Sequence, residues 1–342
     1  MKTLEIHGST GNSFIYVGET LRNLKNYIPS ENVVIITDKN VKQLYENDFP
    51  THPVITIDTG EKIKNLDTVR NIYEKLLALE ADRSTFIVGI GGGIVCDIAG
   101  FVASTYLRGV RFGFVSSTLL SQVDASVGGK NGVNFKEYKN MVGVFNQPEF
   151  VICDLNLLNT LPKKEILNGM AEIVKHGAIE DADLFAYLEE HSQKALALDI
   201  EVIEKLVYDS IVIKSTIVNQ DELEKGARRK LNFGHTFGHA FEKTTGVPHG
   251  EAVSTGMVVA SEISVKGGHL PPKDAQRIET LLQKIGLPVR IQVECKSVLD
   301  ALTKDKKRKG NHIYFVFLNK IGNAFVDQIP IKDLEPVIRH FC

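Results

Sequence analysis

Several residues and patterns that would place this chain in a special class are rare or absent. Its 342 residues contain no tryptophan, and the four cysteines, Cys96, Cys153, Cys295 and Cys342, lack the close pairing typical of zinc or redox sites. We therefore expect buried or idle thiols and no disulfide framework. The formal charge of −2 gives no overall field that would recruit nucleic acid or an anionic membrane, so neither is an expected partner.

Long apolar segments are also missing. Residues 1–12 have no apolar core, so no secretory signal is expected. The longest apolar stretch, residues 86–104, contains five glycines and Asp97, and a carboxylate in mid-span costs roughly 2.5–3.5 kcal/mol on insertion scales. This stretch therefore fits a buried strand and helix better than a membrane span, and we expect a cytoplasmic protein.

The length of the chain predicts two domains. In the first half, short β-branched runs alternate with helical segments; the runs are residues 32–38, 54–60 and 86–90, and the clearest helix is residues 94–107. This alternation is typical of an α/β fold with a parallel, doubly wound sheet. We predict a Rossmann-like nucleotide-binding domain over residues 1–156.

The second half, residues 157–342, has a different pattern. Apolar residues recur at helical spacing through residues 162–190 and 198–220, which predicts a mostly α-helical domain. The exception is a strand-like run at residues 312–318, which is expected to form a hairpin with residues 322–326.

Three segments carry the residues that suggest chemistry. Residues 88–97 (VGIGGGIVCD) place glycines between a strand and a helix, where backbone N–H groups can approach a pyrophosphate, although a tight structural turn explains them equally well. Residues 116–130 mix hydroxyls and glycines with Asp124 and Lys130. Lys130 and Lys139 could supply cations for a phosphate or carboxylate, the alternative being an ordinary surface loop.

The third segment is rich in histidine. His235 and His239 are four residues apart, which places them on one face of a helix in a common metal-pair spacing. A third histidine, His249, follows ten residues later, with Glu251 two positions beyond it. Packing or hydrogen bonding would explain a single pair of histidines, but three in so short a span favour a metal site.

Taken together, these motifs resemble the 3-dehydroquinate synthase family. The resemblance rests on the glycine segment and on VDASVGGKNGVN (123–134), GMAEIVKHG (169–177), RRKLNFGHTFGHAFE (228–242) and HGEAV (249–253), in the order and spacing of the family over roughly residues 38–310. It implies an N-terminal nucleotide-binding domain, a helical C-terminal domain that binds metal and substrate, and an active site in the cleft between them.

The resemblance also implies particular ligands. Glu172, His235 and His249 match residues that hold a zinc or cobalt ion, whereas His239 matches a nearby substrate or proton-relay group, in contrast to the spacing argument. The positions that match NAD contacts are Asp38, Asn40, Glu61, Lys64, Gly92, Gly93, Asp97, Ser117, Thr118, Lys130, Lys139 and Thr160. The positions that match the substrate site are Asp124, Lys130, Lys139, Asn140, Lys175, Lys214, Arg228, Asn232, His239 and Lys306.

The small-molecule substrate of this family is 3-deoxy-D-arabino-heptulosonate 7-phosphate, which carries a carboxylate and a phosphate at opposite ends. Lys214 and Arg228 are expected at the carboxylate, and Lys130, Asn140, Lys306 and the Arg108 of a partner chain at the phosphate. Arg108 resembles an arginine that reaches the site of a neighbouring subunit, which implies a homodimer. Asp124, Lys175 and His239 are candidate proton carriers.

The chain departs from the family pattern at a few positions. Ser116-Ser117-Thr118 stands where members usually have Pro-Thr-Thr, Ala125 replaces a serine, and Asn131 replaces a threonine. Ser117 and Thr118, the two of these positions that match cofactor contacts, both carry a hydroxyl. Three alternatives stay open: another sugar-phosphate cyclase, a related metal-dependent polyol dehydrogenase, and a degenerate homologue that binds nucleotide without catalysis.

Overall fold

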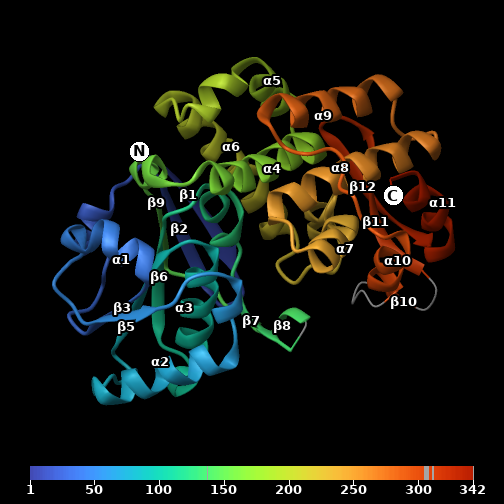
Figure 1. Cartoon of the computed structure of the whole chain (residues 1–342). Helices are drawn as coiled ribbons and strands as arrows, with labels where there is room; N and C mark the ends of the chain where they lie inside the picture. Colours follow the sequence, from blue (N-terminus) through green and yellow to red (C-terminus); the bar gives the residue numbers. More distant parts are fainter. Residues whose placement is uncertain (137, 304–307, 310–311, 342) are drawn as a thin grey trace. The chain divides into compact units, whose positions relative to one another are not determined.

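The computed structural model describes residues 1–136, 138–303, 308–309 and 312–341. The chain forms two compact units, Met1–Leu161 with Lys214–Leu223, and Pro162–Ile213 with Glu224–Cys342 (Figure 1). Helix α6 (Ile200–Gln220) begins in the second unit, and its last turns, from Lys214, belong to the first.

The first unit is built on a seven-stranded sheet. Strands β1 (Lys2–Gly8) and β2 (Gly11–Val17) form an antiparallel hairpin at one edge, and every other neighbouring pair is parallel. The order is β1-β2-β9-β6-β5-β3-β4, with β3 (Val33–Asp38), β4 (Val54–Ile57), β5 (Phe86–Gly91), β6 (Arg111–Ser116) and β9 (Phe150–Cys153). The predicted α/β fold with a parallel sheet is confirmed, and the edge hairpin is an addition to it.

Strand β5 shows why the sheet is covered on both faces. Its alternate residues Phe86, Val88 and Ile90 belong to a core that also contains residues of the short helix η1 (Leu21–Asn26) and of α1 (Lys39–Tyr45). On the opposite face, a Cβ atom at Gly89 would lie 2.9 Å from the Cβ of Ala99, so glycine allows helix α3 (Gly93–Thr105) to pack closely against the strand. The helical segments of this unit are η1 (Leu21–Asn26), α1 (Lys39–Tyr45), η2 (Glu46–Asp48), η3 (Glu61–Ile63), α2 (Leu66–Ala78), α3 (Gly93–Thr105), η4 (Tyr106–Arg108), a π-helical turn η5 (Ser121–Ala125) and η6 (Leu155–Thr160).

The direction of winding reverses between β3 and β5. From β3 the chain adds β4 on one side, and it then crosses to place β5 on the other. In sheets of this kind, ligands bind where the carboxyl ends of such strands meet. Asp38 at the end of β3 and Gly91 at the end of β5 mark this position. A separate hairpin of β7 (Lys130–Phe135) and β8 (Tyr138–Phe145) belongs to the same unit.

The second unit is mainly helical, as predicted. Three of its helices follow a proline, Pro162, Pro248 or Pro271, whose restricted φ suits a helix entry. The helices, with α6 shared, are α4 (Lys163–Glu180), α5 (Ala182–Leu196), η7 (Ala227–Asn232), α7 (His235–Thr245), α8 (His249–Lys266), α9 (Pro272–Ile285), α10 (Cys295–Thr303) and α11 (Ile331–Phe341).

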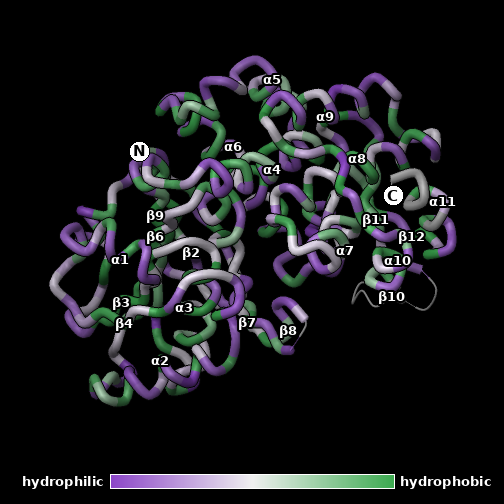
Figure 2. Tube along the Cα trace, in the orientation of Figure 1, coloured by the Kyte–Doolittle hydropathy of each residue, from purple (hydrophilic) through white to green (hydrophobic). Residues whose placement is uncertain are grey.

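A small sheet completes the second unit. The predicted hairpin is present as β11 (His312–Lys320) and β12 (Asn323–Pro330), which pair antiparallel, and the two-residue strand β10 (Arg308–Lys309) joins β11. The hydropathy of the chain follows this architecture, since the tube through strand β3 is largely hydrophobic while α2 alternates between hydrophobic and hydrophilic residues (Figure 2).

The cysteines differ from one another. Cys96 and Cys153 are free and fully buried, as expected, and burial raises the pKa of both thiols, which keeps them protonated. Cys295 is disulfide-bonded, so the expectation of an idle thiol is wrong there. Spacing along the sequence could not reveal this, because a disulfide depends on which residues the fold brings together. No helix among the described residues combines the length and apolarity that crossing a bilayer requires.

Candidate metal and cofactor sites

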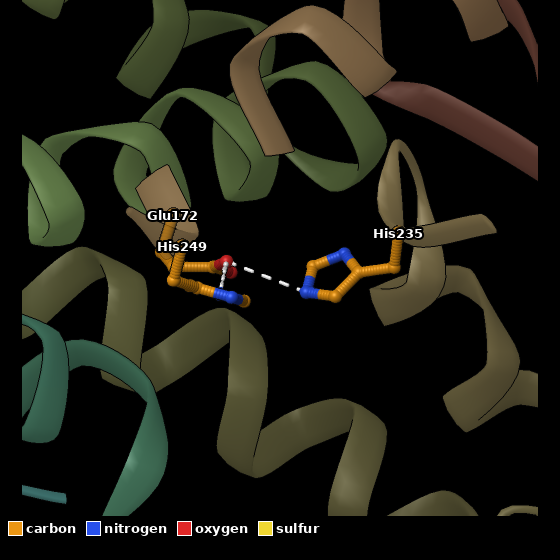
Figure 3. A group of neighbouring side chains, drawn as sticks. All are labelled: Glu172, His235 and His249. Atoms are coloured by element: carbon orange, nitrogen blue, oxygen red, sulfur yellow. Dashed lines mark hydrogen bonds and ion pairs between the residues drawn. The ribbon is translucent and has the colours of Figure 1, made fainter. Parts of the chain in front are cut away.

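Three side chains from three helices of the second unit gather around one point. Glu172 lies in the middle of α4, while His235 and His249 are the first residues of α7 and α8. The Nε2 atom of His249 is 3.1 Å from Oε1 of Glu172, and the Nε2 atom of His235 is 3.4 Å from the same oxygen. Figure 3 shows the two rings directed at the carboxylate from different sides. One candidate ligand atom from each residue lies within 4.8 Å of the others.

The other nitrogen of each ring faces an oxygen. The Nδ1 atom of His235 is 3.1 Å from the backbone carbonyl of Phe233, and the Nδ1 atom of His249 is 3.8 Å from Oε2 of Glu242. The carbonyl of Phe233 can hold the proton of His235 on Nδ1 and leave the Nε2 lone pair for a metal, which is the usual outer arrangement of metal-binding histidines, and the carboxylate of Glu242 faces His249 from the corresponding side. The donor set of two imidazoles and one carboxylate therefore fits zinc or cobalt, with a position left for substrate.

Glycines make this convergence of helices feasible. Gly234, just before His235, has φ 77°, a left-handed conformation that favours glycine. A Cβ atom at Gly256 of α8 would lie 2.0 Å from the carbonyl oxygen of Gly234, and one at Gly250 would lie 2.6 Å from the Cα of Asn168 in α4. Larger residues would force the helices apart and separate the starts of α7 and α8.

The carboxylate of Glu172 is completely buried, and groups of both charges lie near it. Lys175, one turn along α4 and equally buried, forms an ion pair with it. Burial alone would lower the pKa of His249, but hydrogen bonds and charge from Glu172 and Glu242 outweigh this effect and raise the pKa to about 9. In the metal-free protein, Lys175 and a protonated His249 therefore both stabilise the Glu172 anion.

His239 is near this cluster without being part of the ligand group. Its side chain is exposed, and its ring centroid is 5.3 Å from that of His235 in an edge-on arrangement. The helical spacing that paired His235 with His239 is real, since both lie in α7, yet the candidate ligand group contains His249 instead. A group at this place could reach a substrate bound at the metal.

In the first unit, the glycine segment forms a close-fitting turn at the start of α3. Gly92 precedes the helix and offers no side-chain cap to its first N–H groups. A Cβ atom at Gly92 would lie 2.9 Å from Cγ2 of Thr118, and one at Gly93 would lie 2.8 Å from the Cβ of Ala125. Ser117 donates its backbone N–H to the Gly91 carbonyl at 2.9 Å. The result is a helix N-terminus whose backbone an anionic group can approach.

The neighbouring strand end carries Asp38. Its side chain caps α1 by accepting hydrogen bonds from the backbone N–H groups of Asn40 at 2.8 Å and Val41 at 2.9 Å. Burial raises the pKa of Asp38, and these two hydrogen bonds counteract part of the rise. Thr160 shares a 2.6 Å hydrogen bond with the hydroxyl of Tyr45.

Lys64, another of the expected cofactor residues, is buried. Its ammonium group pairs with Asp97 of α3 and donates a 2.6 Å hydrogen bond to Oδ1 of Asn140. Burial raises the pKa of Asp97, and the charge of Lys64 opposes that rise. Glu61 lies 4.0 Å from the ammonium group of Lys139.

The expected substrate residues are distributed over both units. In the first, Lys214 contacts both the side chain and the carbonyl oxygen of Asp124, while Lys130 is exposed. In the second, Arg228 is 1% exposed, and Asn232 donates a 2.6 Å hydrogen bond to Glu224. Lys306 lies outside the described residues.

Arg108 is exposed on a short left-handed turn. Its φ is 70° and that of the preceding Leu107 is 50°, two consecutive non-glycine residues in a conformation that is costly for L-amino acids. Such strain is typical of functional turns, and this one presents the arginine to solvent.

Two residues of these sites were not anticipated. Glu242, the carboxylate beside His249, lies seven positions after His235 and so on the same face of α7, a signal that the sequence does contain. Asn134, which bonds Glu61 and Asn140, has no recognisable local signal because its partners are distant in the sequence.

Comparison with known proteins gives a consistent picture. A family model described as 3-dehydroquinate synthase N-terminal matches residues 54–168, and one described as 3-dehydroquinate synthase C-terminal matches residues 169–308. A 3-dehydroquinate synthase of Streptococcus sanguinis (strain SK36) is 43% identical over 322 residues, covering 90% of each chain. One of Alkaliphilus metalliredigens (strain QYMF) is 41% identical over 337 residues, covering 95% of this chain and 94% of the relative.

Among solved structures, a 2-deoxy-scyllo-inosose synthase complexed with carbaglucose-6-phosphate, NAD+ and Co2+ has a TM-score of 0.90 to this chain. The two are 28% identical and cover each other completely.

Proposed function

The chain belongs to the 3-dehydroquinate synthase family, and on that premise we propose that it converts 3-deoxy-D-arabino-heptulosonate 7-phosphate to 3-dehydroquinate and phosphate. The observation that carries this proposal is the convergence of Glu172, His235 and His249, since a degenerate homologue would be expected to lose part of such a group. The activity is that of a carbon–oxygen lyase in the shikimate pathway to aromatic amino acids.

We propose NAD and zinc or cobalt as the cofactors, NAD in the first unit and the metal in the second. The solved 2-deoxy-scyllo-inosose synthase contains NAD+ and Co2+, and both sites described above fit such groups. When bound, NAD accepts and later returns a hydride, and the metal polarises a substrate oxygen as a Lewis acid.

The protein's own residues would hold and orient the substrate. Lys214 and Arg228 supply cations for the carboxylate, and Lys130, Lys139, Asn140 and Lys306 supply donors for the phosphate. Two separated groups of donors fix the direction of a substrate that is anionic at both ends. Arg228 and Lys175 suit this task because burial strengthens their interaction with an anion.

Proton transfer needs groups beside the reacting carbons. Asp124 accepts a hydrogen bond from the ammonium group of Lys214, and Lys175 pairs with Glu172, so both belong to networks that can relay a proton. His239 is exposed beside His235, which suits exchange of a proton with substrate. We propose Asp124, Lys175 and His239 as the proton carriers.

We further propose a homodimer in the cytoplasm. The strained, exposed turn at Arg108 supports a role in reaching a second subunit. Mass measurement by light scattering should give twice the 37.9 kDa of the chain.

A second candidate is another sugar-phosphate cyclase, favoured by the structural likeness to 2-deoxy-scyllo-inosose synthase. The higher identity to 3-dehydroquinate synthases argues against it. The buried cations Lys214 and Arg228 also favour a substrate that carries a carboxylate.

The stoichiometry of NAD tests the proposal against the dehydrogenase alternative. Because the hydride returns to the same substrate molecule, phosphate should be released continuously with no net NADH. The measurement follows phosphate and near-ultraviolet absorbance together. One NADH formed for each substrate consumed would contradict the proposed function.

A further inference from the structure

The β7–β8 hairpin carries Lys130, Lys139 and Asn140, three of the proposed phosphate ligands, and it is irregular at one point. Val133 pairs with Val142, and Phe135 pairs with Tyr138, so Asn134 on β7 lies opposite residues 139–141 on β8. Bulges of this kind turn backbone groups away from the ladder. Here the bulge contains both Asn134 and the two ligands Lys139 and Asn140.

The groups that the bulge releases bind a different segment. The backbone N–H of Asn134 donates to the carbonyl of Lys64 at 2.8 Å, and Asn134 forms an isolated parallel bridge with Asn65. Its side-chain amide donates to Oε1 of Glu61 at 2.7 Å. Glu61 and Lys64 are proposed NAD contacts, so the hairpin is fastened to the cofactor segment through Asn134.

The same side chain holds Asn140. Oδ1 of Asn134 accepts the backbone N–H of Asn140 at 2.9 Å, and Asn140 has a left-handed φ of 51°, which costs energy unless neighbouring groups stabilise it. Lys64 donates to Oδ1 of Asn140, which leaves the amide N–H groups of Asn140 as donors for an anion. The side-chain N–H of Asn134 therefore bonds the cofactor segment, while its Oδ1 bonds the hairpin residue Asn140.

We propose that Asn134 is a positioning residue that couples the NAD site to the phosphate site. The inference rests on the proposed function, because it takes Glu61 and Lys64 as cofactor contacts and Lys139 and Asn140 as phosphate ligands. A ligand that orders the segment from Glu61 to Asn65 also orders Asn140, and the reverse holds by thermodynamic reciprocity. NAD and phosphate should therefore bind cooperatively.

The test measures the dissociation constant of NAD by calorimetry on the metal-loaded enzyme, with and without saturating inorganic phosphate. In the unmodified protein, phosphate should tighten NAD binding by about fivefold or more, the usual lower range for coupled sites. In Asn134→Ala this ratio should fall to about one. A general loss of stability would weaken NAD binding both with and without phosphate and would leave the ratio of the two dissociation constants unchanged. Loss of this ratio therefore identifies a positioning role.

Two further variants sharpen the test. Asn32→Ala is the matched control, because Asn32 also donates two side-chain hydrogen bonds in the first unit, to Asp82 and Thr85, at the amino end of β3. It should keep the ratio. Asn134→Asp places a carboxylate against Glu61 and should lose the ratio.

Retention of the ratio in Asn134→Ala, its absence from the unmodified protein, or equal loss in Asn32→Ala would overturn the proposal. Phosphate release from the heptulosonate substrate by the unmodified protein separates these outcomes from failure of the proposed function. An enzyme that turns over without the coupling refutes the role of Asn134 alone. A protein that neither binds NAD nor releases phosphate refutes both.

Discussion

The two units present their candidate ligand groups in different ways. The metal group of the second unit consists of side chains, with Glu172 completely buried and both histidines at helix starts. The candidate cofactor site of the first unit combines side chains such as Asp38 and Lys64 with a backbone turn at the start of α3, around Gly92 and Gly93. Removing one metal ligand should therefore destroy the metal site, while the glycine turn of the cofactor site should respond mainly to added bulk.

Metal ligands should show the largest effect. His249→Ala removes one of three ligands and should lower metal affinity by more than the roughly 10–100-fold that loss of an outer hydrogen-bond partner costs. Turnover should fall to background, while NAD binding should stay unchanged. Metal content after dialysis, measured by mass spectrometry, checks this.

His239→Ala is the matched control for that variant. His239 lies on the same helix as His235 but outside the ligand group, so metal content should be nearly normal while turnover falls. Equal metal loss in the two variants would show that the helical spacing had identified the ligands after all.

A smaller effect is expected from added bulk in the first unit. In Gly93→Ala the new methyl would lie 2.8 Å from the Cβ of Ala125, and overpacking of this kind costs roughly 1–3 kcal/mol. If the cost falls on the NAD-binding conformation, affinity for NAD should fall about 5- to 150-fold. Titration with NAD by calorimetry measures it. Loss of bound metal in this variant would break the comparison, because the two sites would not be independent.

The smallest predicted effect is a pH dependence confined to the metal group. The pKa of His249 is raised to about 9 from an ordinary 6.5, so its protonated form stabilises the metal-free protein below pH 6.5, and this stabilisation is lost as the pH rises through about 9. A metal must displace that proton. Zinc affinity should therefore rise about tenfold between about pH 7 and pH 8, measured by competition with a chelating dye. A flat profile would show that His249 binds no metal in the neutral form.

The sequence predicted some elements of the fold and missed others. The β-branched runs of β3 and β5 and the hairpin of β11 and β12 were predicted because local periodicity reflects burial. The edge hairpin of β1 and β2 was missed although Leu4 and Ile6 alternate with polar residues. The sharing of α6 between the units was also missed, since helical periodicity says nothing about which core a helix joins.

Local sequence patterns also failed to identify the metal ligands, because these come from separate helices. Local spacing paired His235 with His239, because the sequence cannot show that α8 approaches α4 at Gly250 and the start of α7 at Gly256. The resemblance to a family supplied Glu172 and His249, which the structure brings together with His235. Hydrogen bonds such as those of Asn134 depend on tertiary structure and had no counterpart in the pattern.

The central claim concerns a substrate that is anionic at both ends, and one measurement tests it directly. Inorganic phosphate is followed with saturating NAD and zinc, using 3-deoxy-D-arabino-heptulosonate 7-phosphate, glucose 6-phosphate and sedoheptulose 7-phosphate in turn. Charge-assisted contacts from Lys214 and Arg228 to the carboxylate should contribute roughly 2–5 kcal/mol in the transition state, a preference of about 30-fold or more for the heptulosonate. Arg228→Ala should lose most of this preference. Comparable release from the sugar phosphates without a carboxylate would contradict the account and favour another sugar-phosphate cyclase.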